Sequence, residues 1–187
     1  MQSGQFWADA LPVLCRVIHT TADFSYRDTL TITDGAIEKA KEEIRRGLPI
    51  ITDTTMAASG INKTAAGKFG IEVHCFIGDE DVKAKAKESG MTRSAVSVEK
   101  AAGCYPECIY AVGNAPTALM RLYELIEEKK IRPALIIGVP VGFVNVVEAK
   151  ELILRTDVPA IVARGRKGGS NIAAAICNAL MYEAGGR

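Results

Sequence analysis

The sequence predicts an α/β protein with three layers, in which helices cover both faces of a mainly parallel five-stranded sheet. Short apolar runs, rich in Val and Ile, alternate along the chain with longer amphipathic segments. The apolar runs have four to six residues and end at glycine or a polar residue, as strands buried on both faces do. Alternation of strand and helix favours parallel pairing through right-handed crossovers.

The five expected strands are residues 48–52, 72–77, 109–112, 134–137 and 160–163. Five parallel strands suit a flavodoxin-like doubly wound sheet. In such sheets the ligand binds beyond the carboxyl ends of the strands, so the residues that follow each strand are the candidates for a site.

The expected helices are residues 3–18, 33–46, 79–89, 115–129, 146–155 and 170–183. The second opens with a Thr-Asp cap and ends before Gly47, and the third ends before Gly90, which is the usual punctuation of helices. The last repeats Ile172, Ile176 and Leu180 at a spacing of four, which gives the helix one apolar face.

Composition limits the possible functions. The chain has 187 residues, 48% of them hydrophobic, and a net charge of +1, so we expect one domain over residues 1–187 and no electrostatic binding to nucleic acid or membranes. Two histidines exclude a multi-histidine metal site, and five scattered cysteines favour reduced thiols in a cytoplasmic protein. No signal peptide or membrane-spanning run is visible in the sequence.

Three strand exits carry residues suited to ligand contact. Asp53 follows the first strand, and Asn114, Pro116 and Thr117 follow the third. The fourth exit, Gly138–Phe143, contains two glycines, Pro140 and an aromatic residue, and loops of this kind enclose flat apolar ligands. Each exit is equally compatible with a structural turn or a helix cap.

The last exit, residues 164–170, is called the basic loop here. Arg164, Arg166 and Lys167 precede two glycines and Ser170 at a helix start. Glycines let a ligand approach the backbone, a helix N-terminus favours anions, and arginine binds carboxylates in a bidentate way. The pattern indicates an anion site, although a solvated basic turn explains it too.

Two further features are candidate site residues. His19 lies at the end of the first helix among polar residues, where Asp23 or a Thr hydroxyl could orient its ring. Histidine titrates near neutral pH, so His19 is a candidate general acid or base; a structural role is the alternative. His74 lies inside a strand pattern and is interpreted as structural. Arg93 follows the Gly90 break and adds a cation or caps a helix.

Seven segments together resemble the precorrin-8X methylmutase family, also called cobalt-precorrin-8 methylmutase, of cobalamin biosynthesis. They are RVIHTTADF at 16–24, ITDTTMAASGI at 51–61, TRS at 92–94, GNAPTAL at 113–119, GVPVGFV at 138–144, Glu148 with Lys150, and GRKGGSNIAAAICNAL at 165–180. They occur in the family's order over nearly the whole chain. In the family a further segment precedes the histidine motif, so we expect a shortened N-terminal segment here.

The resemblance implies an isomerase that moves a methyl group from C-11 to C-12 of a corrin precursor, formally a 1,5-sigmatropic shift. The product is hydrogenobyrinic acid, or cobyrinic acid in the cobalt-containing route. The resemblance also implies a homodimer, with His19 as the proton donor to the macrocycle. No cofactor and no protein-bound metal is expected. The substrate-binding residues expected are Arg16, Thr20, Asp53, Arg93, Asn114, Pro116, Thr117, Pro140, Gly142, Phe143, Arg166, Lys167 and Ser170.

Two other functions stay open at this point. A non-catalytic protein that binds or carries corrinoids would keep the same binding residues without turnover. A phosphate- or nucleotide-binding flavodoxin-like protein would need the basic loop alone. Conversion of precorrin-8 by the protein separates the enzyme from both.

Overall fold

The computed structural model describes residues 4–186, with side chains from residue 9 onward. Its strands are β1 (Leu30–Ile32), β2 (Ile50–Thr52), β3 (Val73–His74), β4 (Ile109–Val112), β5 (Leu135–Gly138) and β6 (Ala160–Ala163). Its helices are α1 (Gly4–Thr21), α2 (Tyr26–Thr29), α3 (Ala36–Arg45), α4 (Thr55–Gly60), α5 (Lys63–Lys68), α6 (Glu80–Ser89), α7 (Arg93–Cys104), α8 (Pro116–Glu127), α9 (Val146–Ile153) and α10 (Ser170–Ala184).

The strands of the described residues form one six-stranded sheet in the order β1-β6-β5-β4-β2-β3. Strands β2 to β6 are mutually parallel, and β1 pairs antiparallel with β6. The five parallel strands alone follow the order 2-1-3-4-5, which is the flavodoxin-like arrangement. The predicted α/β class and all five predicted strands are confirmed.

The prediction of five strands missed β1. Leu30 pairs with Ala163 and Ile32 with Ile161, at the outer edge of the sheet. The strand has three residues and only Ile32 is fully buried, so it lacks the apolar run by which the other strands were recognised. The ladder continues to Thr33, whose N–H donates to the Ala160 carbonyl. Thr33 therefore extends the strand instead of capping a helix, and α3 begins at Ala36.

Other boundaries also differ from the prediction. The strand expected at 72–77 shrinks to two residues, because β3 lies at the other edge of the sheet and pairs only with the short β2. Helix α7 was not among the predicted helices; the Thr92 hydroxyl caps it by accepting from the Ala95 N–H, so the alternative of a helix cap at this segment is confirmed. The short helices α2, α4 and α5 were missed as well.

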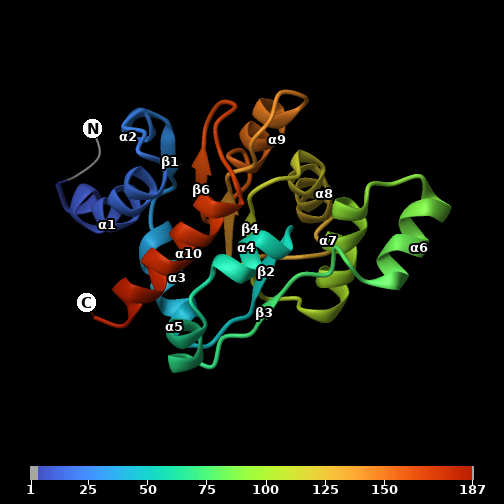
Figure 1. Ribbon diagram of the computed structural model, residues 1–187, viewed down its shortest axis with the longest axis horizontal. Helices are drawn as coiled ribbons and strands as arrows, with labels where there is room; N and C mark the ends of the chain where they lie inside the picture. The colour runs from blue at the N-terminus through green and yellow to red at the C-terminus, as the bar shows by residue number, and fades with distance from the viewer. Residues whose placement is uncertain (1–3, 187) are drawn as a thin grey trace.

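Helices cover both faces of the sheet (Figure 1). Along each central strand alternate residues face opposite layers. Ile109, Ala111 and Ile137 pack in the core shared with α1, α3 and α10, whereas Tyr110 and Ile136 pack in the core shared with α7, α8 and α9. Most of these side chains are completely buried, which explains why the strands read as continuous apolar runs.

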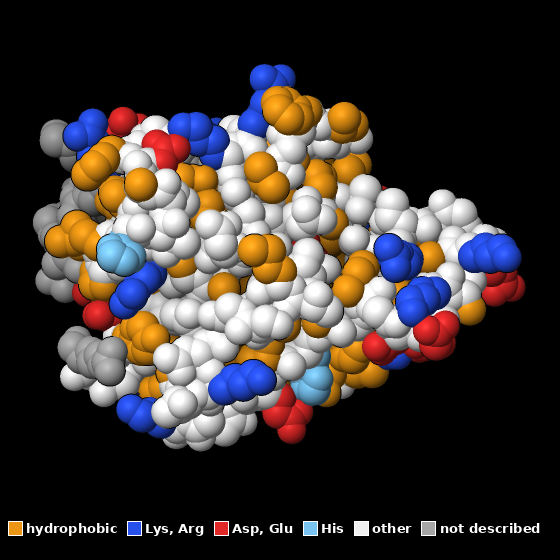
Figure 2. Space-filling view, in the orientation of Figure 1, with side chains coloured by type: hydrophobic (Ala, Val, Ile, Leu, Met, Phe, Trp, Pro, Cys, Tyr) orange, Lys and Arg blue, Asp and Glu red, His pale blue; other side chains and the backbone are white. Residues whose placement is uncertain are grey.

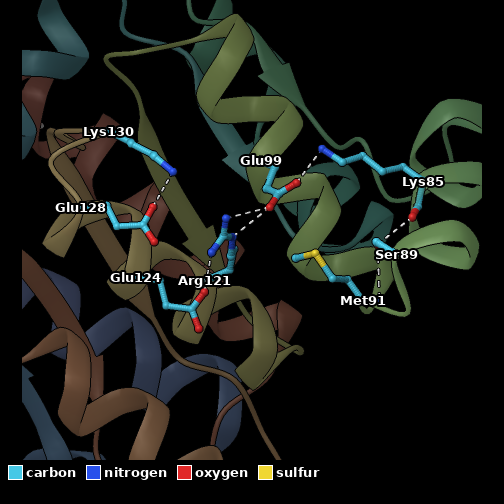
Figure 3. Close-up of polar contacts among 8 residues, drawn as sticks. All are labelled: Lys85, Ser89, Met91, Glu99, Arg121, Glu124, Glu128 and Lys130. Atoms are coloured by element: carbon cyan, nitrogen blue, oxygen red, sulfur yellow. Dashed lines mark hydrogen bonds and ion pairs between the residues drawn. The ribbon is translucent and has the colours of Figure 1, made fainter.

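An ion-pair network links helices α6, α7 and α8 (Figure 3). Glu99 of α7 accepts from Lys85 of α6 at 2.7 Å and from Arg121 of α8 at 2.8 Å. Arg121 also pairs with Glu124, one turn along α8. The side chains of Glu99 and Arg121 are only 17% and 20% exposed, and the pairs join three successive helices at one carboxylate.

The loops after β5 and β6 approach so closely that one position requires glycine. A Cβ on Gly168 would overlap the carbonyl oxygens of Val139 and Pro140. Beside it, the Gly169 N–H donates to the Val139 carbonyl at 2.8 Å. The two exits are therefore joined backbone to backbone.

We expect Gly168→Ala to lower the free energy of unfolding by about 1–3 kcal/mol, because the added methyl forces two loops apart. Urea denaturation measures the change. Gly67→Ala is the matched control: Gly67 lies in α5 with open space around its Cβ position, and alanine there is neutral or stabilising by up to about 1 kcal/mol. Equal stability of Gly168→Ala and the wild type would contradict the close approach.

Candidate functional site

Asp53 joins two strand exits at the centre of the sheet edge. It directly follows β2, and its carboxylate accepts from the backbone N–H groups of Gly113, Asn114 and Ala115 at 2.9, 2.8 and 2.7 Å. Those residues follow β4, the neighbouring strand. The β2/β4 boundary is the switch point at which doubly wound sheets open a crevice for ligands.

Asp53 is 6% exposed. Burial raises the pKa of its carboxyl above the ordinary value, while the three N–H bonds act in the opposite direction and favour the carboxylate. Its oxygens are already engaged by the chain. Asp53 thus supports the 113–115 turn from inside the protein. The side chain of Asn114 in that turn is exposed.

Hydroxyl groups connect the same exits to two helix starts. The Thr54 hydroxyl lies 2.7 Å from that of Ser170, the first residue of α10. The Thr92 hydroxyl donates to that of Thr117, in the first turn of α8. A Cβ on Gly113 would overlap the backbone of Ser170, so these segments pack tightly.

Two predicted residues lie at the start of neighbouring helices. Pro116 opens α8, as the sequence indicated. Arg93 opens α7 and is exposed, with no ion pair among the described residues. The contact between Thr92 and Thr117 therefore brings Arg93 to the edge of the sheet where β4 ends.

The loop after β5 presents apolar side chains to solvent. Phe143 is 86% exposed and Val144 77%. Pro140 is buried beneath them, and the Gly142 N–H donates to the carbonyl of Arg166 in the basic loop. In Figure 2 hydrophobic and basic side chains lie together along the top of the view, where Figure 1 places α9 and the loop before α10.

The basic loop uses two of its three cations internally. Arg164 forms a bidentate pair with Glu151 of α9, at 2.8 and 2.6 Å. The Lys167 ammonium donates to Asp23 at 2.6 Å and to the Ser25 hydroxyl at 3.0 Å. Arg166 is exposed and has no ion pair among the described residues. Of the three, Arg166 is the cation that remains open to an anion.

His19 lies in the last turn of α1 and is exposed, as is the adjacent Thr20. The expected orientation of its ring by Asp23 or a Thr hydroxyl is wrong. The bond from Lys167, with help from Ser25, lowers the pKa of Asp23 to about 2, and the Thr21 hydroxyl donates to the Val17 carbonyl. Within the described residues no side chain fixes the imidazole.

Arg16 lies away from the basic loop. Its guanidinium stacks over the ring of Tyr182 at 5.3 Å. Tyr182 is in the last turn of α10, roughly 18 Å along that helix from Ser170 at 1.5 Å per residue. The guanidinium of Arg16 therefore lies apart from the cations of the basic loop.

Sequence reasoning overlooked Lys150 as an individual residue. It is 0% exposed on α9, and its ammonium donates to the carbonyls of Gly165 and Lys167 at 2.8 and 2.9 Å. The signal was a lysine among the buried Val146, Ala149 and Ile153 of a short helix. No cluster of three metal-ligating side chains was found in the described part of the chain.

The model of the precorrin-8X methylmutase family matches residues 1–183. The chain belongs to this family. The resemblance carried by the seven sequence segments is thereby confirmed.

Individual members of the family are similar over most of their length. The cobalt-precorrin-8 methylmutase of Salmonella typhimurium is 46% identical, over 91% of this chain and 80% of that protein. That of Leptospira interrogans is 44% identical, over 90% of this chain and 80% of that protein. The crystal structure of precorrin-8x methyl mutase from Thermus thermophilus superposes with a TM-score of 0.87 at 39% identity, over 94% of this chain and 86% of that one.

We expect Asp53→Asn to lower the free energy of unfolding by about 2–4 kcal/mol, because an amide group offers one acceptor oxygen to three buried N–H donors. Urea denaturation measures the loss. Asp157→Asn, at an exposed position, is the control and should change stability by less than about 0.5 kcal/mol. If Asp53→Asn were as stable as the control variant, the fold would not depend on this carboxylate.

Proposed function

We propose that this chain moves the methyl group of precorrin-8X or cobalt-precorrin-8 from C-11 to C-12, with His19 as the proton donor. Membership in the family makes the chain a methyl-shifting isomerase of cobalamin biosynthesis. The position of His19 carries the assignment of the donor. His19 is exposed at the end of α1, and the turn that follows it contains Asp23, which binds Lys167 of the basic loop.

The reaction requires little covalent chemistry from the protein. In a 1,5-shift the bond from the methyl carbon to C-11 breaks as the bond to C-12 forms, so substrate and product are isomers and no oxidant or reductant is consumed. A proton delivered to the macrocycle withdraws electron density and assists migration. Positioning and one acid are the contributions left to the enzyme, and general acid catalysis gives about 10²–10⁴-fold.

Large apolar side chains are exposed in segments that follow α1, β2 and β5. Phe24, in the turn after α1, is 78% exposed, Met56, in α4 after β2, is 66% exposed, and Phe143, in the loop after β5, is 86% exposed. Such side chains suit contact with the flat apolar face of a macrocycle. Arg166 and Arg93 supply cations that are not neutralised by the chain, and arginine binds carboxylates in a bidentate way.

The proposal includes a cytoplasmic homodimer. All five cysteines are free thiols, two of them, Cys15 and Cys104, exposed, which fits a reducing compartment. No helix among the described residues has the length and apolar character needed to cross a bilayer.

We expect His19→Ala to keep the fold and product binding but to lower kcat by about 10²–10⁴-fold, because the acid is lost and the binding surface is kept. The assay follows the visible spectrum of hydrogenobyrinic acid formed from precorrin-8X. His74→Ala, a histidine on the edge strand β3, is the control and should retain turnover. Normal kcat for His19→Ala would remove His19 from the mechanism. Wild-type protein that binds the product tightly without converting substrate would be a carrier.

Arg166→Ala should weaken binding of hydrogenobyrinic acid more at low salt than at high salt, because screening of exposed charges is weakest there. The dissociation constant is measured by absorbance titration over a series of salt concentrations. The control is Arg132→Ala. Arg132 is exposed and precedes β5, so it lies at the amino ends of the parallel strands, opposite to the basic loop. An identical salt dependence for the two variants would show that Arg166 does not contact the ligand.

A further inference from the structure

Lys150 is a completely buried ammonium without a carboxylate partner in the described part of the chain. Its neighbour Glu151 pairs with Arg164 instead, and Glu148 is exposed. The partners of Lys150 are the carbonyl oxygens of Gly165 and Lys167. The methyl shift as described above assigns no task to this charge.

Such a charge is costly to the fold. Burial lowers the pKa of Lys150 to about 8, which means that the interior disfavours the ammonium and that two carbonyl bonds do not offset the lost hydration. Well-packed apolar residues at buried ionic positions are often neutral or stabilising. Packing of α9 alone therefore gives no reason for a lysine at this position.

The two bonds set the direction of the neighbouring peptide groups. In a trans peptide the C=O and the following N–H point in opposite directions, and the chain contains no cis peptide among its described residues. With the carbonyls of Gly165 and Lys167 turned toward Lys150, the N–H groups of Arg166 and Gly168 point away from it. Neither N–H has an acceptor among the residues that the structure describes.

The rest of the basic loop is held from other sides. The Arg166 carbonyl accepts from Gly142 and the Gly169 N–H donates to Val139, both in the exit of β5. Gly165 adopts a left-handed φ of 79°, which reverses the chain after Arg164. The loop is thus held by Lys150 and by the exit of β5, while the N–H groups of Arg166 and Gly168 have no acceptor among the described residues.

We propose that Lys150 is a positioning residue, which holds the basic loop so that the N–H groups of Arg166 and Gly168 receive a carboxylate of the substrate. Both N–H groups point away from Lys150, and two such donors in one loop can bind the oxygens of a carboxylate. The buried positive charge beneath it adds to the attraction for a carboxylate. The inference rests on the proposed function, since it takes the polycarboxylate corrin as the ligand.

The same loop connects to the acid. The Lys167 side chain binds Asp23 and Ser25, which lie four and six residues after His19. Lys150 thus holds the backbone of Lys167. The side chain of Lys167 in turn binds the turn that follows His19, the proposed acid. The effect of Lys150 on the substrate is nevertheless one of binding, because it touches no reacting atom.

The test is Lys150→Met, which removes the charge and the donors while keeping an unbranched side chain that is one atom shorter. We expect folded protein whose KM for precorrin-8X and Kd for hydrogenobyrinic acid rise about tenfold or more, as loss of a charge-assisted bond implies, with kcat changed by less than about threefold. Lys150→Arg should recover much of the affinity. Lys87→Met, at an exposed lysine of α6, is the matched control and should behave as wild type.

Wild-type KM and Kd for Lys150→Met would overturn the proposal, and so would a fall in kcat at unchanged KM. If that variant does not fold, amide NMR of the wild-type protein decides: on titration with hydrogenobyrinic acid the Arg166 and Gly168 amide protons should move downfield, and unmoved resonances would overturn the proposal. Failure of the proposed function is distinguished separately, because it would appear as a wild-type enzyme that binds the product but forms none.

Discussion

The functional edge of the protein depends on the buried carboxylate of Asp53. A doubly wound sheet separates its loops at the switch point, here between β2 and β4, and nothing in the topology alone holds the two exits together. Three N–H groups converging on Asp53 supply that connection. They also place Gly113 where the start of α10 packs against it. The carboxylate of Asp53 therefore serves as an internal support of the loops.

The distribution of charge follows the same division between support and recognition. A net charge of +1 excludes extended anionic partners but permits a local site. Within the basic loop, Glu151 and Asp23 neutralise Arg164 and Lys167, and these pairs shape the loop. Arg166 is exposed and has no ion pair among the described residues, which is the basis for its proposed contact with the substrate. Recognition of a polycarboxylate then depends on a few charges, on backbone donors and on an apolar rim, which together discriminate by geometry more than by total charge.

The sequence was informative where a pattern is local and periodic. The five parallel strands are buried on both faces, so each appears as an unbroken apolar run, and the glycines after α3 and α6 mark real helix ends. Strand β1 was invisible because its partner residues in β6 lie 129 to 133 residues further along the chain and only one of its own residues is buried. For the same reason the sequence placed Lys167 in an anion site but could not show that Asp23 occupies its ammonium. Pairings across the chain are properties of the fold.

The placement of His19 combines a rigid scaffold with an imidazole that no described side chain orients. The helix beneath it is firmly packed, since Val13 and Val17 of α1 are completely buried against α10. The imidazole itself is exposed and has no orienting side chain among the described residues, unlike a histidine held by a carboxylate. The backbone position of His19 is therefore fixed, whereas no described side chain fixes the orientation of its ring. In the role proposed for His19, as proton donor to a large macrocycle, the bound substrate would select the ring orientation, and the precision of the reaction would come from how the protein holds the substrate.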